Sequence, residues 1–139
     1  LRHRSFSFQE FSQRYADPTE DLEFVTREAR LQDVKNRQNS IEIDDPKLQA
    51  DWDTLQDMVI EDAQAAYQWA ISKGIAKEQA RAVLPEGLTL SRMYMNGTLR
   101  SWVHYIELRT SNGTQKEHIE VAEACAEEIT KIFPLLKEI

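Results

Sequence analysis

The 139-residue sequence contains a single cysteine, Cys125, and no long run of apolar residues. One cysteine excludes an intramolecular disulfide and a zinc site built from several thiolates. Without a stretch of about 20 apolar residues, no transmembrane helix is expected. The start also lacks a charged segment followed by an apolar one, so we expect no signal peptide and a reducing, cytoplasmic setting.

The common motifs for phosphate and metal binding are missing as well. The chain has neither a GxxxxGK[ST] phosphate loop nor the GxGxxG pattern of dinucleotide-binding folds. Its histidines, His3, His104 and His118, do not have the spacing of metal ligands, so no metal site is predicted. No internal repeat or low-complexity tract is present, and the length fits one domain over residues 1–139.

Charge is unevenly distributed along the chain. There are 17 basic and 24 acidic residues, a net charge of −7. The first fourteen residues hold Arg2, Arg4 and Arg14 against Glu10, whereas the remainder has 14 basic and 23 acidic residues, a net of −9. This acidic remainder disfavours a general affinity for nucleic acid or an anionic membrane. A local anion site in the basic segment stays possible.

Short extended segments are expected between the helices. Alternating side chains over residues 5–11 predict an extended segment, and Asp17 and Pro18 predict a turn over 15–21. We expect a short strand near 22–27, a polar loop over 35–45 and a strand over 88–95. Asn96-Gly97 should then interrupt the chain.

Four helices are predicted. Asp45 can cap a long helix and Pro46 suits its first position, while Gly74 is a plausible stop. The apolar face of this helix is expected to comprise Leu48, Trp52, Leu55, Val59, Ala63, Ala66 and Ala70.

The other three helices are expected over 76–83, over 98–107 and from a Thr114–Glu117 capping box to a stop at Pro134. Cys125 lies on the apolar stripe of the last helix and is expected to be packed rather than nucleophilic. The pattern predicts a mostly helical α+β fold.

Three segments could carry chemistry. Arg2 and Arg4 share one face of an extended strand, and Ser12 and Arg14 add a hydroxyl and a third cation. Arginine matches phosphate oxygens in bidentate fashion, so this segment is either a phosphate site or an exposed basic strand with surface salt bridges. Arg81 is near a helix end, where a cation also interacts with the helix dipole.

The third segment covers residues 96–109. It leads into a helix N-terminus, whose free N–H groups favour anions. Arg100 and His104 are four residues apart and share a face, whereas Arg109 is roughly half a turn out of phase with Arg100. Either the helix ends before Arg109, or the two arginines serve different sites, including sites in different subunits. A solvated helix face is the structural alternative.

Together these segments resemble the flavin-dependent thymidylate synthases, the ThyX family. The family signature is Arg-His-Arg, two residues, Ser, one residue, Asn, two residues, Ser, one residue and Arg. The chain matches it at all fixed positions but one, where Gln9 replaces the asparagine: Arg2, His3, Arg4, Ser7, Gln9, Ser12 and Arg14. The family-like segments ARAVLP (80–85) and LRSWVHYIELR (99–109) follow in the expected order.

The resemblance implies thymidylate synthesis. Such enzymes convert dUMP to dTMP with a methylene group from methylenetetrahydrofolate and a hydride from FAD that NADPH has reduced. They are homotetramers whose active sites are shared between subunits, and they need no cysteine nucleophile on the pyrimidine. The chain resembles the C-terminal part of such a domain, without the N-terminal segment.

Residue roles follow from the same resemblance. The flavin site would include Arg2, His3, Arg4, Glu10, Thr98, Arg100 and His104. The dUMP site would include Arg2, Glu10, Phe11, Ser12, Gln13, Arg14, Arg81 and Arg109. Ser12 and Arg14 would lie near the phosphate. Arg109 would be the catalytic residue, polarising the uracil ring and favouring its N3-ionised form.

Two other functions are compatible with parts of the sequence. Phe6, Phe8 and Phe11 alternate with the N-terminal arginines and could form a stacking platform for nucleic acid. The acidic remainder argues against that function. A non-catalytic oligomeric fragment that only preserves a subunit interface is the other alternative.

Overall fold

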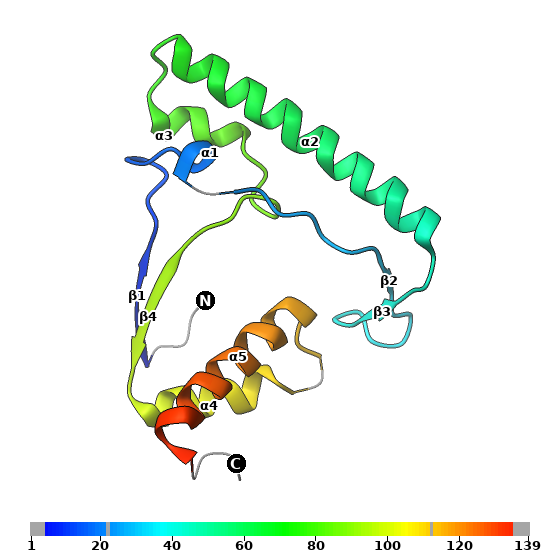
Figure 1. Ribbon diagram of the computed structural model, residues 1–139, viewed down its shortest axis with the longest axis vertical. Coiled ribbons are helices and arrows are strands. Elements are labelled where there is room, and N and C mark those ends of the chain that lie inside the picture. Colours follow the sequence, from blue (N-terminus) through cyan, green and yellow to red (C-terminus); the bar gives the residue numbers. More distant parts are fainter. Residues whose placement is uncertain (1–4, 22, 112, 135–139) are drawn as a thin grey trace. The chain divides into compact units, whose positions relative to one another are not determined.

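Helices account for about half of the chain, and the strands between them are short (Figure 1). The computed structural model describes residues 5–21, 23–111 and 113–134. The combination of helices with short strands confirms the predicted α+β fold. The described residues form two compact units, one from residues 5–8, 30–42 and 95–134 and the other from residues 9–29 and 43–94. We call them unit 1 and unit 2.

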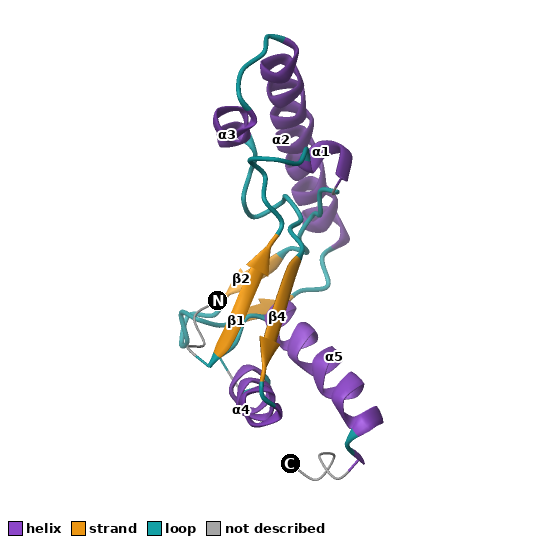
Figure 2. Cartoon of the chain, turned by 90° about the vertical axis from the view of Figure 1, so that its left-hand side faces the viewer, coloured by secondary structure: helices purple, strands orange, loops and turns teal. Residues whose placement is uncertain are grey.

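The elements follow one another in a simple order. Strand β1 (Phe6–Glu10), helix α1 (Pro18–Asp21), β2 (Arg30–Gln32) and β3 (Ser40–Glu42) precede the long helix α2 (Pro46–Ser72). Then come α3 (Lys77–Ala80), the 3₁₀ turn η1 (Arg81–Val83), β4 (Met93–Gly97), α4 (Leu99–Arg109) and α5 (Lys116–Ile132). Strands β1 and β4 pair, as do β2 and β3 (Figure 2). In the described part of the chain, no helix is long and apolar enough to span a bilayer.

Helix α2 of unit 2 begins as the sequence predicts. The Asp45 carboxylate accepts hydrogen bonds from the backbone N–H groups of Lys47 (3.1 Å) and Leu48 (3.0 Å), and Pro46 occupies the first turn. These bonds satisfy donors that the helix itself leaves unpaired. Beyond the other end, Gly74 has φ +76°, which a glycine adopts without the strain of a Cβ. Both predicted boundaries are confirmed.

The first half of the predicted apolar face of α2 is not buried within the chain. The buried residues are Gln56, Ala63, Tyr67 and Ala70, whereas the apolar side chains at positions 48, 52, 55 and 59 are 40–55% exposed. Tyr67 and Ala70 pack with Ala80, and Leu84 contacts this cluster. Burial therefore follows the residues that face α3 and η1.

Gln56 pairs with the backbone where a strand is expected, and residues 23–27, the described part of the range 22–27, form no strand. Its side-chain oxygen accepts from the Arg27 backbone N–H at 2.7 Å, and its amide nitrogen donates to the Arg27 carbonyl at 2.9 Å. A side chain thus satisfies backbone groups that a neighbouring strand would otherwise pair. The segment makes only one described β-bridge, between Phe24 and Thr89, and the strand expected over 88–95 begins at Met93.

In unit 1, the segment expected to be a polar loop contains a strand. β2 and β3 are antiparallel, with Arg30 opposite Glu42 and Leu31 opposite Ile41. Between them, the Asp33 carboxylate accepts from the backbone N–H groups of Lys35 and Asn36, and these bonds lower the pKa of Asp33. This Asx-type turn closes the hairpin, which residue alternation alone does not reveal.

The core of unit 1 forms around Phe6, Tyr105 and Ala122. Trp102 meets Phe6 edge-to-face with ring centroids 5.0 Å apart. Gly97 lies against the Phe6 ring, so a Cβ atom there would be 2.4 Å from Phe6 Cδ1. Asn96-Gly97 does not interrupt β4, contrary to prediction, because the strand must bring the Gly97 backbone against this ring.

The ends of the last two helices also differ from prediction. Thr98 caps α4 by accepting from the Ser101 backbone N–H at 3.2 Å, and the helix continues two residues past the expected end, to Arg109. Helix α5 has no capping box, because Gln115 is its N-cap and makes no side-chain cap bond. Glu117 instead forms a salt bridge with Arg30 of β2.

We predict that Gln56→Ala lowers the free energy of unfolding by about 2 kcal/mol, because a partly buried donor and acceptor at Arg27 lose their partner. Urea denaturation followed by circular dichroism measures this. Gln68→Ala, at an exposed position on the same helix, is the matched control. Equal stability of the two variants would contradict the bridging role of Gln56.

Gly97→Ala should also destabilise the chain, by about 2 kcal/mol, because the added methyl overlaps the Phe6 ring and forces it to shift. Near-ultraviolet circular dichroism should show an altered aromatic environment. Gly87→Ala is the control, since a Cβ there meets nothing within 4 Å. Unchanged aromatic signals and stability in Gly97→Ala would refute the close packing.

Candidate functional site

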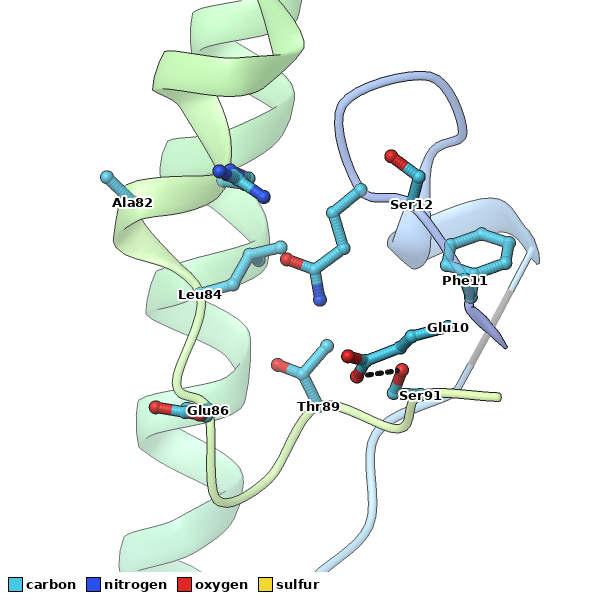
Figure 3. Close-up of a pocket in the computed structure, with 10 residues that line it drawn as sticks. Glu10, Phe11, Ser12, Ala82, Leu84, Glu86, Thr89 and Ser91 are labelled. Atoms are coloured by element: carbon cyan, nitrogen blue, oxygen red, sulfur yellow. Dashed lines mark hydrogen bonds between the residues drawn. The ribbon is translucent and has the colours of Figure 1, made fainter. Parts of the chain in front are cut away.

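Unit 2 contains a pocket of about 700 Å³ where the end of β1 faces the segment around η1 and the residues after it (Figure 3). Two groups of residues line it. The motif segment contributes Glu10, Phe11, Ser12 and Gln13, and the second segment contributes Arg81, Ala82, Leu84, Glu86, Thr89 and Ser91. The fold therefore brings together two of the three segments that the sequence singles out.

Hydrogen bonds between the two segments hold this pocket. The Phe11 N–H donates to the Arg92 carbonyl at 2.8 Å, and Ser91 Oγ donates to Glu10 Oε1 at 2.9 Å. Figure 3 shows the Glu10 carboxylate turned toward Ser91, with Thr89 beside it. Thr89 Oγ1 in turn donates to the Pro85 carbonyl at 2.7 Å, which stabilises the turn after η1.

Glu78 contacts two of the residues predicted to bind dUMP. Its carboxylate lies 3.1 Å from the Arg14 guanidinium, and its backbone carbonyl accepts from Arg81 Nε at 3.3 Å. The Arg14 side chain is 55% exposed and Arg81 is exposed, so both retain donors for an incoming anion. Arg14 and Arg81 are therefore both in contact with Glu78 of α3.

A second, smaller pocket of about 400 Å³ lies in unit 1. It is lined by Ser5, Arg100, Ser101, Val103, His104 and Glu107. The predicted pair Arg100 and His104 shares this site, as their spacing implies. Thr98 is occupied in capping α4, and its hydroxyl also lies 3.0 Å from that of Ser101.

Arg109 does not share the face of Arg100, because α4 runs unbroken from Leu99 to Arg109. Of the two sequence alternatives, an early helix end is therefore wrong, and the two arginines belong to different surroundings. Arg109 is half-buried, and its Nε atom is buried with no hydrogen-bond partner among the described residues.

Two polar residues that the sequence does not single out for function lie close to this part of α4. Tyr105 is 5% exposed, and its hydroxyl is 2.9 Å from Nε2 of His118 on α5. Burial raises the pKa of Tyr105, Cys125 adds to this rise, and the positive charge of Arg109 opposes it. In the sequence, the Tyr105–His118 pair is indicated only by the four-residue spacing of Tyr105 and Arg109.

Other expectations about the site meet different outcomes. Arg2, His3 and Arg4 lie outside the described residues.

Cys125 is half-buried, and burial raises the pKa of its thiol, as expected for a packed cysteine. Phe6 is 9% exposed, so it cannot offer its ring face to a base, which weakens the nucleic-acid platform. Among the described residues, no group of three or more His, Cys, Asp or Glu side chains could hold a metal ion.

The two pockets offer different chemistry. The Arg81 guanidinium and the Ser12 hydroxyl of the first pocket suit a phosphate, while the Glu10 carboxylate can accept from a sugar hydroxyl or a ring N–H. In the second pocket, Arg100 and His104 on the first turns of α4 could contact the phosphates of a flavin dinucleotide. The donor sets therefore fit a nucleotide and part of an FAD molecule.

Comparison with known proteins identifies the family of the chain. The sequence profile of a family described as thymidylate synthase complementing protein matches residues 1–135. A protein of Paramecium bursaria Chlorella virus 1, described as a probable flavin-dependent thymidylate synthase, is 53% identical over 96% of this chain and 61% of its own length. The flavin-dependent thymidylate synthase of Synechocystis is 49% identical over 96% of this chain and 60% of its own.

Solved structures share the fold. Crystal structures of the UMP/dUMP methylase PolB from Streptomyces cacaoi, bound with 5-Br UMP or 5-Br dUMP, superpose with TM-scores of 0.80 and 0.81 at 27% identity. The matched region comprises 93% of this chain and 61% of the PolB chain in the first structure, and 98% and 62% in the second. The chain thus spans about 60% of the length of these relatives. It belongs to the thymidylate synthase complementing protein family, the family of the flavin-dependent thymidylate synthases.

Proposed function

We propose that this chain takes part in the flavin-dependent methylation of dUMP to dTMP. Methylenetetrahydrofolate would supply the methylene group, and NADPH would reduce the flavin. The observation that carries the proposal is the pocket of unit 2, which joins motif residues Ser12 and Gln13 to Arg81 across almost 70 residues of sequence. Binding of 5-Br dUMP by the structurally similar PolB supports a nucleotide in this fold.

In this pocket, Ser12 and Arg81 bind the phosphate of dUMP, together with Arg14, which follows the lining residues Ser12 and Gln13 along the chain. Two arginines and a hydroxyl provide charge-assisted hydrogen bonds to its oxygens. Glu10 would repel the phosphate, so it contacts a neutral donor of the nucleotide or the flavin, and its bond to Ser91 holds it in place. Phe11 and Gln13 complete the wall around the nucleotide.

Arg109 acts on the uracil ring. A fixed guanidinium beside the ring stabilises the form that has lost the N3 proton, and the negative charge spreads toward C5. This electron-rich carbon attacks the methylene group, so no cysteine nucleophile is needed. The half-buried position of Arg109 favours this role, because partial exclusion of water strengthens the interaction of the cation with the ring anion.

The flavin would be held by Arg100 and His104, with Thr98 at the start of the same helix, and by Arg2, His3 and Arg4 of the motif. When bound, FAD carries the hydride that completes the methyl group. The arginines and histidines of these two segments would hold its phosphates.

We further propose that the active sites form in a homotetramer. The exposed apolar side chains of α2 support assembly: Leu48, Trp52, Leu55 and Val59 are 40–55% exposed along one stripe. Subunit sharing also accounts for the separate faces of Arg100 and Arg109 on α4, because each can then serve a site with a different partner.

Arg81→Ala is expected to weaken dUMP binding about tenfold or more, because it removes a charge-assisted bond to the phosphate. Affinity for deoxyuridine, which has no phosphate, should stay the same. Calorimetry and the change in flavin absorbance during a dUMP titration measure this. Arg37→Ala, at an exposed arginine of the β2–β3 loop, is the control.

Equal losses for dUMP and deoxyuridine would contradict the phosphate role of Arg81. Absence of flavin and dUMP binding in the unaltered chain would refute catalysis by this piece alone and favour the oligomeric fragment. Salt-sensitive binding of single-stranded oligonucleotides without flavin binding would favour the nucleic-acid module instead.

Arg109→Ala should abolish tritium release from C5-labelled dUMP, because the ring anion loses its counter-charge. The far-ultraviolet circular dichroism spectrum should be unchanged. Release at the rate of the unaltered protein would exclude the catalytic role of Arg109.

A further inference from the structure

A residue that stabilises a ring anion must hold its cation in a fixed orientation, and the backbone of Arg109 alone does not provide this. Its Nε atom is buried and has no hydrogen-bond partner among the described residues. An arginine whose Nε lacks an acceptor can still turn about its side-chain bonds. The orientation of the guanidinium therefore depends on the side chains against which it rests.

Helix spacing makes Tyr105 a neighbour of the Arg109 side chain. It lies four residues before Arg109 on α4, and side chains of a helix lean toward its N-terminus, so the Arg109 side chain extends over the turn that carries Tyr105. The opposing effect of the Arg109 charge on the pKa of Tyr105, against the larger effect of burial, agrees with this proximity.

Tyr105 itself is held on several sides. Its ring meets those of Phe6 and Trp102 edge-to-face, with centroids 6.2 Å and 5.8 Å away. These contacts place the ring, but they do not determine where its hydroxyl proton points. That is the contribution of His118, whose Nε2 lies 2.9 Å from the Tyr105 hydroxyl oxygen.

We propose that His118 is a positioning residue for thymidylate synthesis: through its hydrogen bond to Tyr105, it fixes the phenol against which the Arg109 guanidinium is oriented toward the uracil ring. The inference rests on the proposed role of Arg109. Neither His118 nor Tyr105 touches the substrate. Helix α5 thereby helps to set the strength of the cation–ring interaction, although no residue of α5 lines either pocket described above.

A purely structural role for the pair makes a different prediction. If the hydrogen bond only holds α4 to α5, its loss lowers the stability of unit 1 and weakens the binding of every nucleotide to a similar extent. If the hydrogen bond orients Arg109, its loss selectively weakens the binding of nucleotides whose ring is ionised at N3.

Comparing dUMP with 5-fluoro-dUMP separates these roles. Fluorine withdraws electrons and makes the N3 proton more acidic, while the sugar and the phosphate stay the same. An oriented Arg109 should therefore prefer 5-fluoro-dUMP. Calorimetric titration of both nucleotides at one pH, with FAD present, gives the ratio of their affinities without requiring turnover.

His118→Ala should reduce this preference about tenfold, the fold-change that corresponds to ~1.4 kcal/mol. Tyr105→Phe keeps the ring and removes the hydroxyl, so it should cause the same loss. His118→Gln retains a hydrogen-bonding group and should restore part of the preference. Glu120→Ala, at an exposed position of α5, should leave it unchanged.

An unchanged ratio in His118→Ala and Tyr105→Phe would overturn the inference and leave the proposed function intact. If His118→Ala does not fold, Tyr105→Phe and His118→Gln decide the question. Failure of the unaltered chain to bind either nucleotide would instead refute the proposed function and, with it, this inference.

Discussion

The burial of Phe6 is the constraint on which the arrangement of β1 depends. Its ring is enclosed by Trp102, Tyr105 and the backbone of Gly97. Because side chains alternate along a strand, this one burial determines the face of every residue in β1. Gly97 is part of this arrangement, since only a residue without a side chain allows the ring to lie so close.

One acidic residue, Glu78, contacts two arginines of unit 2. Glu78 holds Arg14 through its carboxylate and Arg81 through its backbone carbonyl. The Arg14–Glu78 pair is exposed, so it adds little to stability and can exchange for a phosphate at small cost. The net charge of −7 is therefore compatible with anion binding, because the field at the pocket depends on nearby side chains more than on the total.

Local signals predict some elements well. The Asp45 cap, Pro46 and Gly74 give both ends of α2, because capping depends on residues close in sequence. The capping box at Thr114 does not form, since Gln115 is the N-cap of α5 and the Glu117 carboxylate pairs with Arg30, a residue far away along the chain. The β2–β3 hairpin is missed for a related reason. Its turn depends on the Asp33 side chain, and its strands are too short to show alternation.

The site shows the same limit. Motif spacing predicts that Arg100 and His104 share one pocket, and the family resemblance names Ser12 and Arg81, which the structure brings into another. The sequence gives no reason to expect Ser91 beside Glu10, since that contact follows from how residues 84–91 fold back toward β1. His118 has no metal-ligand spacing, and its partner Tyr105 is visible only when α4 packs against α5.

The amide of Gln56 ties residues 23–29 to a helix rather than to a sheet. Gln49 acts in the same way, since its side-chain oxygen accepts from the Ala29 backbone N–H at 2.6 Å. The protection of these two backbone amides from solvent exchange therefore depends on α2 remaining folded. In a hydrogen-exchange experiment, the amides of Arg27 and Ala29 should therefore open together with the N-terminal half of α2. This is expected although the β2–β3 hairpin, which belongs to unit 1, lies between them in the sequence.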